Sequence, residues 1–324
     1  MAALYSRLVL TAACALSLLT TTTARAQDYP TKQVRIIIPF APGGLNDLIG
    51  RMVATHLTTK FGRQVIPENR AGAGGVIATE LVAHSPPDGH VLLIVSIANA
   101  VNPWLYKLNF DPQKSFAPIA GIVSSENVLA VNNDIPVKNV KEFIALAKKE
   151  KGKMPYASGG IGGSLHLAME LFKVTAGIEL VHIPFKGAGP GIIDVIGGHT
   201  KAINGTISSV SPHIRAGKLR ALAVTGKKRN EALPDVPTFE ESGVPGYEAG
   251  NWIGLAAPAG TPASIIARLQ KELAEMQASA EFKKQLVIHG SEALVLGSAA
   301  FGKFVDDETE KWGKVVKQAG IKAQ

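Results

Sequence analysis

Apolar and polar positions divide this chain into short apolar runs and longer amphipathic stretches, which alternate along most of its length. The apolar runs are continuous, as expected of parallel strands buried on both faces of a sheet, and they lie at residues 34–39, 64–67, 91–95, 128–131, 156–157, 180–183, 202–204 and 219–224. Between them, apolar residues recur at helical spacing at residues 48–57, 77–81, 140–147, 167–172 and 192–196. This alternation predicts an α/β fold with doubly wound sheets flanked by helices.

Two segments share one design, in which a strand leads through a glycine-rich turn into an amphipathic helix. The first turn is residues 41–47 (APGGLND), and the second is residues 159–164 (GGIGGS). Each turn should leave unpaired backbone N–H groups at the start of a helix, which is a ready anion-binding site. Two such turns indicate two lobes that close on one small anion, and this favours a binding protein over a catalyst.

The loops between strands and helices also predict how the chain is divided. Residues 126–134 and 240–251 are the candidate crossings between two lobes. We therefore expect a discontinuous first domain of residues 27–125 and 241–324, and a second domain of residues 126–240.

The candidate ligand-binding residues gather at the two turns and at the ends of two other strands. Doubly wound sheets bind ligands outside the carboxyl ends of their strands, so Ser96 and Thr206 should face the variable end of the ligand. Asp47 should orient the first turn or hold water, because a carboxylate ligand would repel it. The residues expected closest to the carboxylate are Gly44, Asn46, Asp47, Gly163, Ser164 and His166. The full predicted set is Phe40, Ala41, Gly43, Gly44, Leu45, Asn46, Asp47, Ser96, Ser158, Gly159, Gly162, Gly163, Ser164, His166, Asn204, Gly205 and Thr206.

Two helix N-termini alone bind an anion too weakly for micromolar affinity. Each stabilises an anion by about 0.3–1 kcal/mol, or about 2 kcal/mol when partly buried, whereas micromolar affinity needs about 8 kcal/mol. Direct hydrogen bonds from backbone and hydroxyl groups, with water expelled as the lobes close, must supply the remainder.

The first 26 residues have the pattern of a cleavable export signal. Arg7 precedes an apolar run at residues 8–19, and Ala24-Arg25-Ala26 fits the small-x-small cleavage rule, so the mature chain should begin at Gln27. The run is shorter than the about 20 residues that a membrane span requires. Cleavage would also remove Cys14, the one cysteine, so we expect no disulfide and no thiol chemistry. These features predict a periplasmic protein.

Charge and motifs exclude several classes of function. The formal net charge is +8, and loss of Arg7 and Arg25 with the signal lowers it to +6, which mildly favours an anionic ligand. Basic clusters lack the aromatic residues that nucleic-acid binding uses. The eight histidines show no metal-ligand spacing, and G-x-S-x-G, P-loop and H-E-x-x-H motifs are absent. We therefore expect no enzyme activity, no cofactor, no metal and no nucleic-acid partner.

One catalytic alternative remains, a secreted hydrolase or transferase that uses Ser164 as nucleophile and His166 as base. Residues two apart at the start of a helix point to different sides, which favours a structural or ligand-facing His166. A third alternative is a receptor that presents its ligand to a sensor kinase.

Ordered motifs through nearly the whole mature chain resemble those of one family, the solute receptors of tripartite tricarboxylate transporters, also called the Bug family. The motifs are residues 39–47 (PFAPGGLND), 68–75 (ENRAGAGG), 88–90 (DGH), 102–106 (NPWLY), 156–158 (YAS), 164–168 (SLHLA), 184–187 (PFKG), 212–214 (PHI), 217–224 (GKLRALAV), 233–238 (LPDVPT) and 243–248 (GVPGYE).

The resemblance implies a two-lobed periplasmic-binding-protein fold, type II-like, with the ligand cleft between the lobes. In this family the turns equivalent to residues 41–47 and 159–166 grip a carboxylate through backbone N–H groups, hydroxyls and bridging water. The receptor then docks on inner-membrane transporter subunits, and we expect it to be a monomer. Gly205 stands where many relatives carry an acidic residue, which disfavours amino acids as ligands, and Phe185 replaces a common tyrosine.

Overall fold

The computed structural model describes residues 29–247 and 249–321, so the predicted export signal lies outside the described residues. From Lys32 onward the described chain forms one compact unit. Its elements are β1 Val34–Ile38, α2 Leu45–Phe61, β2 Val65–Asn69, the 3₁₀ turn η1 Ala73–Gly75, α3 Val76–Ala83, β3 Val91–Ser96, α4 Ile97–Leu105, β4 Phe116–Asn132, α5 Val140–Lys149, β5 Pro155–Ser158, α6 Ser164–Ala176, β6 Val181–Pro184, α7 Ala188–Ile196, β7 Ala202–Thr206, α8 Ile207–Arg215, β8 Leu219–Val224, β9 Gly250–Pro258, α9 Ala263–Ala278, α10 Ala280–Ile288, β10 Ser291–Gly297 and α11 Ser298–Ala319. No helix in these two ranges is long and apolar enough to cross a membrane.

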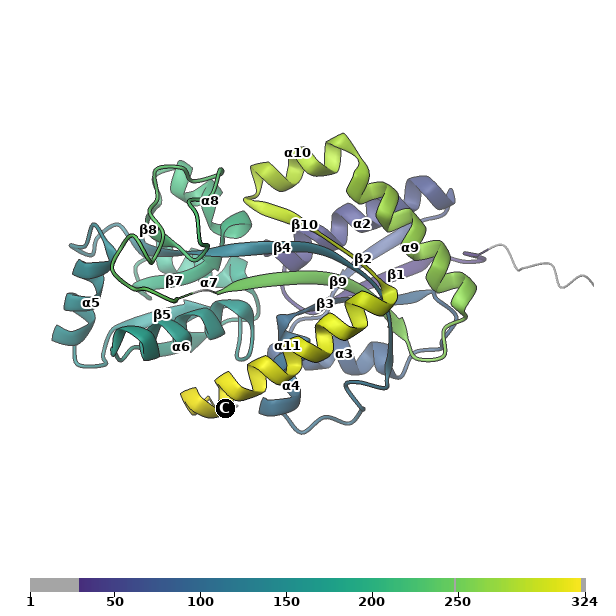
Figure 1. Ribbon diagram of the computed structural model, residues 1–324, viewed down its shortest axis with the longest axis horizontal. Coiled ribbons are helices and arrows are strands. Elements are labelled where there is room, and N and C mark those ends of the chain that lie inside the picture. The colour runs from purple at the N-terminus through teal and green to yellow at the C-terminus, as the bar shows by residue number, and fades with distance from the viewer. Residues whose placement is uncertain (1–28, 248, 322–324) are drawn as a thin grey trace, which may run out of the picture. The chain divides into compact units, whose positions relative to one another are not determined.

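The described strands form one ten-stranded sheet whose main path runs β2-β1-β3-β9-β4-β7-β5-β6, with β8 and β10 also paired to β4. Strand β1 is parallel to β2 and β3, and β5 is parallel to β6 and β7. The long strand β4 joins these two groups and pairs antiparallel with β9 and β7. Figure 1 shows β4 and β9 side by side in the middle of the molecule, between the end with α5 and α6 and the end with α2 and α9.

Strand β4 changes partners partway along its length. Residues Phe116 to Glu126 lie opposite β9, whereas Asn127 to Val131 lie opposite β7. One continuous strand therefore belongs to both groups of strands, and Glu126 marks the point where one group gives way to the other.

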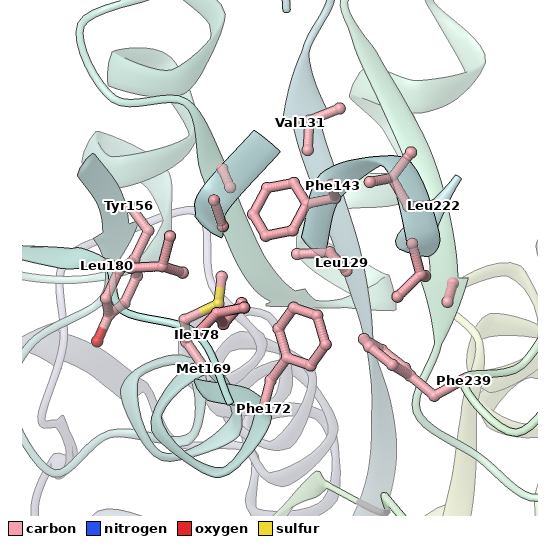
Figure 2. Close-up of a cluster of buried hydrophobic side chains, with 14 of the residues drawn as sticks. Leu129, Val131, Phe143, Tyr156, Met169, Phe172, Ile178, Leu180, Leu222 and Phe239 are labelled. Carbon is pink, nitrogen blue, oxygen red and sulfur yellow. The ribbon is translucent and has the colours of Figure 1, made fainter. Parts of the chain in front are cut away.

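An aromatic core packs around Phe172 of α6 (Figure 2). Its ring is fully buried and lies 5.1 Å from the ring of Phe239 and 6.0 Å from that of Phe143. Edge-to-face and tilted aromatic pairs of this kind stabilise a core beyond the area that they bury. This core fixes α6, the helix that follows the second glycine turn, against β4 and β5.

Every predicted strand and helix is present, but the sequence pattern missed β9, β10, the first half of β4 and the helices α4, α8, α10 and α11. Strand β9 contains Gly250 and Gly254, and the first half of β4 contains Pro118, Gly121 and two serines, which weaken a strand pattern. The sheet is mixed instead of parallel throughout, because β4 pairs antiparallel with the predicted strands β7 and β8 as well as with the missed strands β9 and β10.

Candidate ligand-binding site

The two glycine turns face one small cavity of about 40 Å³. Its lining residues come from both groups of strands and from the helices that follow them. They are Phe40, Gly44, Leu45, Asn46, Ser96, Ile97, Gly159, Gly163, Ser164, Leu165, Ala188, Thr206 and Asn251.

Five of the described helices begin at this cavity. Each of the helices α2, α4, α6, α7 and α8 contributes to the lining its first residue, the residue just before it, or both. For α2, α6, α7 and α8, no side chain in the described chain caps the first turn. The first N–H groups of a helix have no partner within the helix, and the helix dipole places about half a positive charge there. The cavity therefore attracts an anion from five directions.

No charged side chain lines the cavity among the residues that the structure describes. The lining offers side-chain hydroxyls at Ser96, Ser164 and Thr206 and amides at Asn46 and Asn251. Asn46 is 8% exposed, and its Oδ1 has no hydrogen-bond partner in residues 29–247 or 249–321. A buried amide oxygen of this kind requires a donor, so this acceptor is left for water or for a hydroxyl group of a ligand.

Asp47 does not line the cavity, and its carboxylate instead accepts hydrogen bonds that hold the first turn in place. Its Oδ2 accepts the Gly43 N–H at 3.2 Å, and its Oδ1 accepts from Arg51 at 2.9 Å and from Asn69 at 3.0 Å. Asn69 also donates to the carbonyl of Phe40 at 2.9 Å. Burial opposes ionisation, but the hydrogen bonds from Arg51, Asn69 and Gly43 lower the pKa of Asp47 below its usual value. Asp47 is therefore ionised at neutral pH, and its carboxylate can keep the turn fixed.

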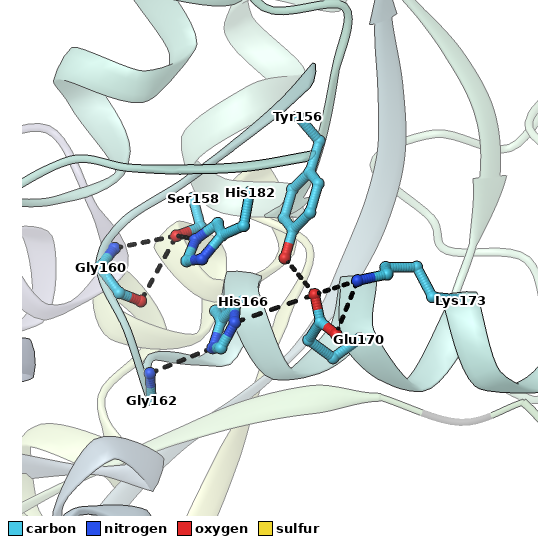
Figure 3. A network of polar contacts seen from close by, with 8 residues as sticks. All are labelled: Tyr156, Ser158, Gly160, Gly162, His166, Glu170, Lys173 and His182. Atoms are coloured by element: carbon cyan, nitrogen blue, oxygen red, sulfur yellow. Dashed lines mark hydrogen bonds and ion pairs between the residues drawn. The ribbon is translucent and has the colours of Figure 1, made fainter. Parts of the chain in front are cut away.

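The second turn is held by two buried side chains that accept its N–H groups (Figure 3). Ser158 Oγ accepts from the Gly160 N–H at 3.1 Å and is bonded to His182 Nε2 at 2.6 Å. His166 Nδ1 accepts from the Gly162 N–H at 3.2 Å. Gly160 and Gly162 have φ angles of 123° and 77°, which side chains rarely tolerate, so the loop needs glycine at both positions.

A stack of rings supports these acceptors. The rings of His166 and His182 lie 4.1 Å apart, and the ring of Tyr156 lies 4.9 Å from His182. Glu170 accepts from Tyr156 Oη at 2.6 Å and from Lys173 Nζ at 2.9 Å, and it lies 3.9 Å from His166 Nε2. Figure 3 shows two groups of polar contacts, one around Ser158 and His182 and one around His166 and Glu170. The stacked rings of His166 and His182 bring these groups together.

Burial keeps both histidines neutral. Desolvation, assisted by the charge of Lys173, lowers the pKa of His166 to about 4. Desolvation, assisted by His166 and Lys173, lowers the pKa of His182 to about 3. A neutral His166 can accept the Gly162 N–H, which an imidazolium cannot.

A third glycine-rich segment, which follows β6, closes against the first turn. The Ala41 N–H donates to the Lys186 carbonyl at 2.8 Å. A Cβ at Gly187 would lie 2.9 Å from the Ala41 nitrogen, and Gly187 has a φ of 149°, so this close approach requires glycine. The segment brings the start of α7 to the cavity.

The structure places nine of the predicted site residues in the lining: Phe40, Gly44, Leu45, Asn46, Ser96, Gly159, Gly163, Ser164 and Thr206. The other eight lie outside it: Ala41, Gly43, Asp47, Ser158, Gly162, His166, Asn204 and Gly205. Most of these hold the turns, as described above. Asn204 instead donates to Tyr247 Oη at 2.6 Å, and Gly205 packs against Val210 of α8.

Sequence reasoning missed four lining residues, Ile97, Leu165, Ala188 and Asn251. Ala188 opens a helix directly after a glycine, which was a usable signal. Asn251 lies on β9, which the hydrophobic pattern does not reveal. Roles in binding for the whole set stay predictions.

The Ser164 and His166 pair does not have the geometry of a nucleophile and base. In the described chain no hydrogen bond joins them, and His166 Nδ1 is occupied by the Gly162 N–H. Ser158 and His182 are bonded, but Ser158 is fully buried and does not line the cavity. Within the described residues, no group of three or more His, Cys, Asp or Glu side chains is arranged to hold a metal ion.

Solved structures define the class of protein. The chain resembles the R. palustris protein Rpa4515, solved with adipate, with a TM-score of 0.88 and 33% identity over 91% of this chain and 100% of that one. It resembles the periplasmic binding protein BugD with a TM-score of 0.87 and 34% identity, over 91% and 100%. It also resembles MatC from Rhodopseudomonas palustris, solved with malate, with a TM-score of 0.84 and 29% identity, over 89% and 100%. The fold is that of a periplasmic binding protein, which confirms the predicted fold class.

Residues 49–321 match the family described as the tripartite tricarboxylate transporter family receptor. The chain belongs to this family, as its motifs predicted.

Proposed function

We propose that this protein is an exported receptor that captures a small organic carboxylate and delivers it to a tripartite tricarboxylate-type transporter in the inner membrane. The ligand carboxylate lies between the starts of α2 and α6, near Gly44, Asn46, Gly163 and Ser164. Ser96, Thr206 and Asn251 contact the rest of the ligand. The protein acts as a monomer and catalyses no reaction on its ligand.

The convergence of five helix N-termini on a cavity without charged side chains carries this proposal. At about 0.3–1 kcal/mol each, five N-termini stabilise an anion by about 2–5 kcal/mol. Hydrogen bonds to a charged acceptor add about 1.5–3 kcal/mol each, so two or three of them suffice for micromolar affinity. The relatives solved with adipate and malate support a carboxylate as the ligand.

The two groups of strands are the two lobes of the receptor. Residues 27–125 and 241–324 form one lobe and residues 126–240 the other. The change of partner along β4 at Glu126 supports the first boundary, and the start of β9 at Gly250 supports the second crossing.

The first test is the stability of residues 27–324 against a panel of mono-, di- and tricarboxylates, amino acids and sugars. A ligand at 100 times its Kd should add about 2.7 kcal/mol to the free energy of unfolding. A shift confined to one carboxylate class supports the proposal and gives the ligand class. Shifts with sugars or cations, and with no carboxylate, would contradict it.

A pair of variants tests the second turn. Gly163 has a φ of −75° and precedes α6, so Gly163→Leu should fold but place its side chain where the carboxylate binds. Gly197 has a φ of −71° at the other end of a helix, and Gly197→Leu is the matched control. Calorimetric titration should find binding lost in the first variant and kept in the second. Wild-type affinity in Gly163→Leu would remove this turn from the site.

Export and delivery need measurements in cells. The periplasmic fraction should contain a chain whose mass starts at Gln27. Deletion of the gene should abolish uptake of the carboxylate found above, and expression of the Gly163→Leu variant should not restore it.

A further inference from the structure

The ligand cavity contains a buried amide oxygen for which the described chain supplies no donor. Asn46 lines the cavity and is 8% exposed, and its Oδ1 has no hydrogen-bond partner among the described residues. Asn251, the other amide in the lining, differs because its Oδ1 accepts the Trp252 N–H at 2.9 Å. The Thr206 hydroxyl is also paired, since its Oγ1 lies 2.7 Å from Ser209 Oγ. The Asn46 oxygen therefore needs a donor from a bound molecule.

Asn46 presents a donor to the cavity as well as this acceptor. It is the second residue of α2, and the first backbone hydrogen bond of that helix runs from the Leu48 N–H to the Gly44 carbonyl at 3.0 Å. The Asn46 N–H precedes this bond, so it has no partner within the helix and can bind an anion. One residue therefore offers a backbone N–H and a side-chain oxygen to the same ligand.

A carboxylate with a hydroxyl group on the neighbouring carbon has the complementary pair of groups. Its carboxylate oxygens accept from N–H groups, and its hydroxyl can donate to an amide oxygen. These two groups lie on adjacent carbon atoms, just as the N–H and Oδ1 lie on one residue. Such a ligand can pair Asn46 Oδ1 while its carboxylate is bound by the helix N-termini.

An ammonium group could also donate to Asn46, but the cavity opposes a positive charge. Five described helices begin there, and each N-terminus carries about half a positive charge. No charged side chain among the described residues lines the cavity, so a cation would lose its hydration without gaining a carboxylate partner. A neutral hydroxyl avoids this cost and is the better donor.

The rest of the ligand is not confined to the ligand cavity, because two larger cavities adjoin it. Phe40 and Gly159 also line a cavity of about 260 Å³, and Ile97 and Asn251 also line one of about 360 Å³. The body of a ligand can extend into either of them. Recognition by Asn46 concerns the carbon next to the carboxylate and sets no limit on the length of the ligand.

We propose that this receptor prefers carboxylates with a hydroxyl group on the carbon next to the carboxylate, and that Asn46 Oδ1 accepts a hydrogen bond from this hydroxyl. The inference rests on the proposed carboxylate site and names the ligand class of that site. A 2-hydroxy acid pairs the buried oxygen directly, whereas its parent acid, which lacks the hydroxyl, does not.

Calorimetric titration with matched acids tests this preference. One series is butyrate, 2-hydroxybutyrate and 2-aminobutyrate, and a second is glutarate, 2-hydroxyglutarate, 3-hydroxyglutarate and glutamate. A third compares tricarballylate with citrate, whose hydroxyl is next to its central carboxylate. In each series that binds, the acid with the neighbouring hydroxyl should bind wild type at least about fivefold more tightly than its parent acid. It should also bind more tightly than the 2-amino and 3-hydroxy acids.

Asn46→Ala removes the side-chain acceptor and keeps the backbone N–H. The ratio of affinities for the 2-hydroxy acid and its parent acid should therefore fall to about one. Asn46→Leu should give the same ratio and replaces Asn46→Ala if that variant does not fold.

Asn102→Ala is the matched control. Asn102 is 3% exposed and its Oδ1 is also unpaired in the described chain, but it does not line the ligand cavity. This variant should keep the wild-type ratio of affinities.

The outcomes distinguish the two proposals. If wild type binds 2-hydroxy acids and their parent acids alike, or binds 2-amino acids more tightly, recognition of a hydroxyl is wrong while the carboxylate site stands. The role of Asn46 is also wrong if its variants keep the wild-type ratio, or if Asn102→Ala loses that ratio as well. If none of these carboxylates binds wild type, the proposed function itself is wrong.

Discussion

We predict that acid destabilises this protein through His166, and that His166→Asn removes that share of the pH dependence. His166 is 4% exposed, and its neighbours are the His182 ring, the Glu170 carboxylate and the Lys173 amine. Protonation at Nδ1 would break the hydrogen bond from the Gly162 N–H. The folded protein therefore resists protonation of this side chain.

The pKa values give the sign and size of the effect. In the unfolded chain a histidine takes up a proton as the pH falls through about 6.5, whereas the pKa of His166 in the folded protein is about 4. The stabilisation from neutral His166 is therefore complete above pH 6.5 and is lost as the pH falls toward 4. Between pH 7 and pH 5 the loss is about 2 kcal/mol, which is about 20-fold in the folding equilibrium.

Urea unfolding at pH 7, 6 and 5 measures this loss. Asn at position 166 offers an amide oxygen in place of Nδ1 as an acceptor for the Gly162 N–H, and it does not titrate. The free energy of unfolding of wild type should fall by about 2 kcal/mol more than that of His166→Asn between pH 7 and pH 5. His199→Asn is the matched control, because His199 is exposed and lies outside this network.

Parallel curves of stability against pH for wild type and His166→Asn would refute the reasoning. They would mean that the folded protein binds a proton at His166 as readily as the unfolded chain does. The hydrogen bond to the second turn would then not depend on a neutral imidazole.

Three further variants test how the turns and the core are held. Asn69→Ala leaves the Phe40 carbonyl without its donor. Urea unfolding should therefore show a free energy of unfolding lower by about 1–2 kcal/mol, and calorimetry should show a weaker ligand affinity. An unchanged affinity would contradict a role for Asn69 in placing the first turn. Ser158→Ala leaves the buried Gly160 N–H unpaired. This variant should bind the ligand more weakly, although Ser158 does not line the cavity. Wild-type affinity would show that the second turn keeps its shape without the Ser158 hydroxyl. Phe172→Ala should lower the free energy of unfolding by about 3–5 kcal/mol. It should leave the ligand affinity of the folded protein unchanged, because Phe172 lies in the aromatic core. A loss below about 1 kcal/mol would mean that this core relaxes around the deleted ring.

The two glycine turns could be predicted because their signal is local. In each case a strand, a glycine-rich turn and a helix follow one another directly along the chain, and glycine marks the positions of unusual φ. The role of Asp47 could be predicted for the same reason. It lies four residues after Gly43 in the same turn, so its carboxylate can reach back to the Gly43 N–H whatever the rest of the fold does.

The starts of α4 and α8 at the cavity could not be predicted, because their position there depends on how distant strands pair. Helices α4 and α8 follow β3 and β7 without a glycine turn. The sequence therefore predicts Ser96 and Thr206 as the ends of strands and gives no sign of the helices that begin there. They meet at one cavity because β9 and β4 join the two groups of strands in the middle of the sheet. The pairing of Ser158 with His182, 24 residues away, likewise depends on strand pairing, here of β5 with β6.

An anion site formed by backbone N–H groups affects how the ligand preference of such receptors can change. A side-chain substitution cannot delete a main-chain donor unless it introduces proline, so attraction for an anion survives most mutations around the cavity. The side chains that face the same space, such as Asn46, Ser96 and Asn251, are free to change. New ligand preferences can therefore arise by single substitutions while the affinity for the carboxylate group is inherited with the fold.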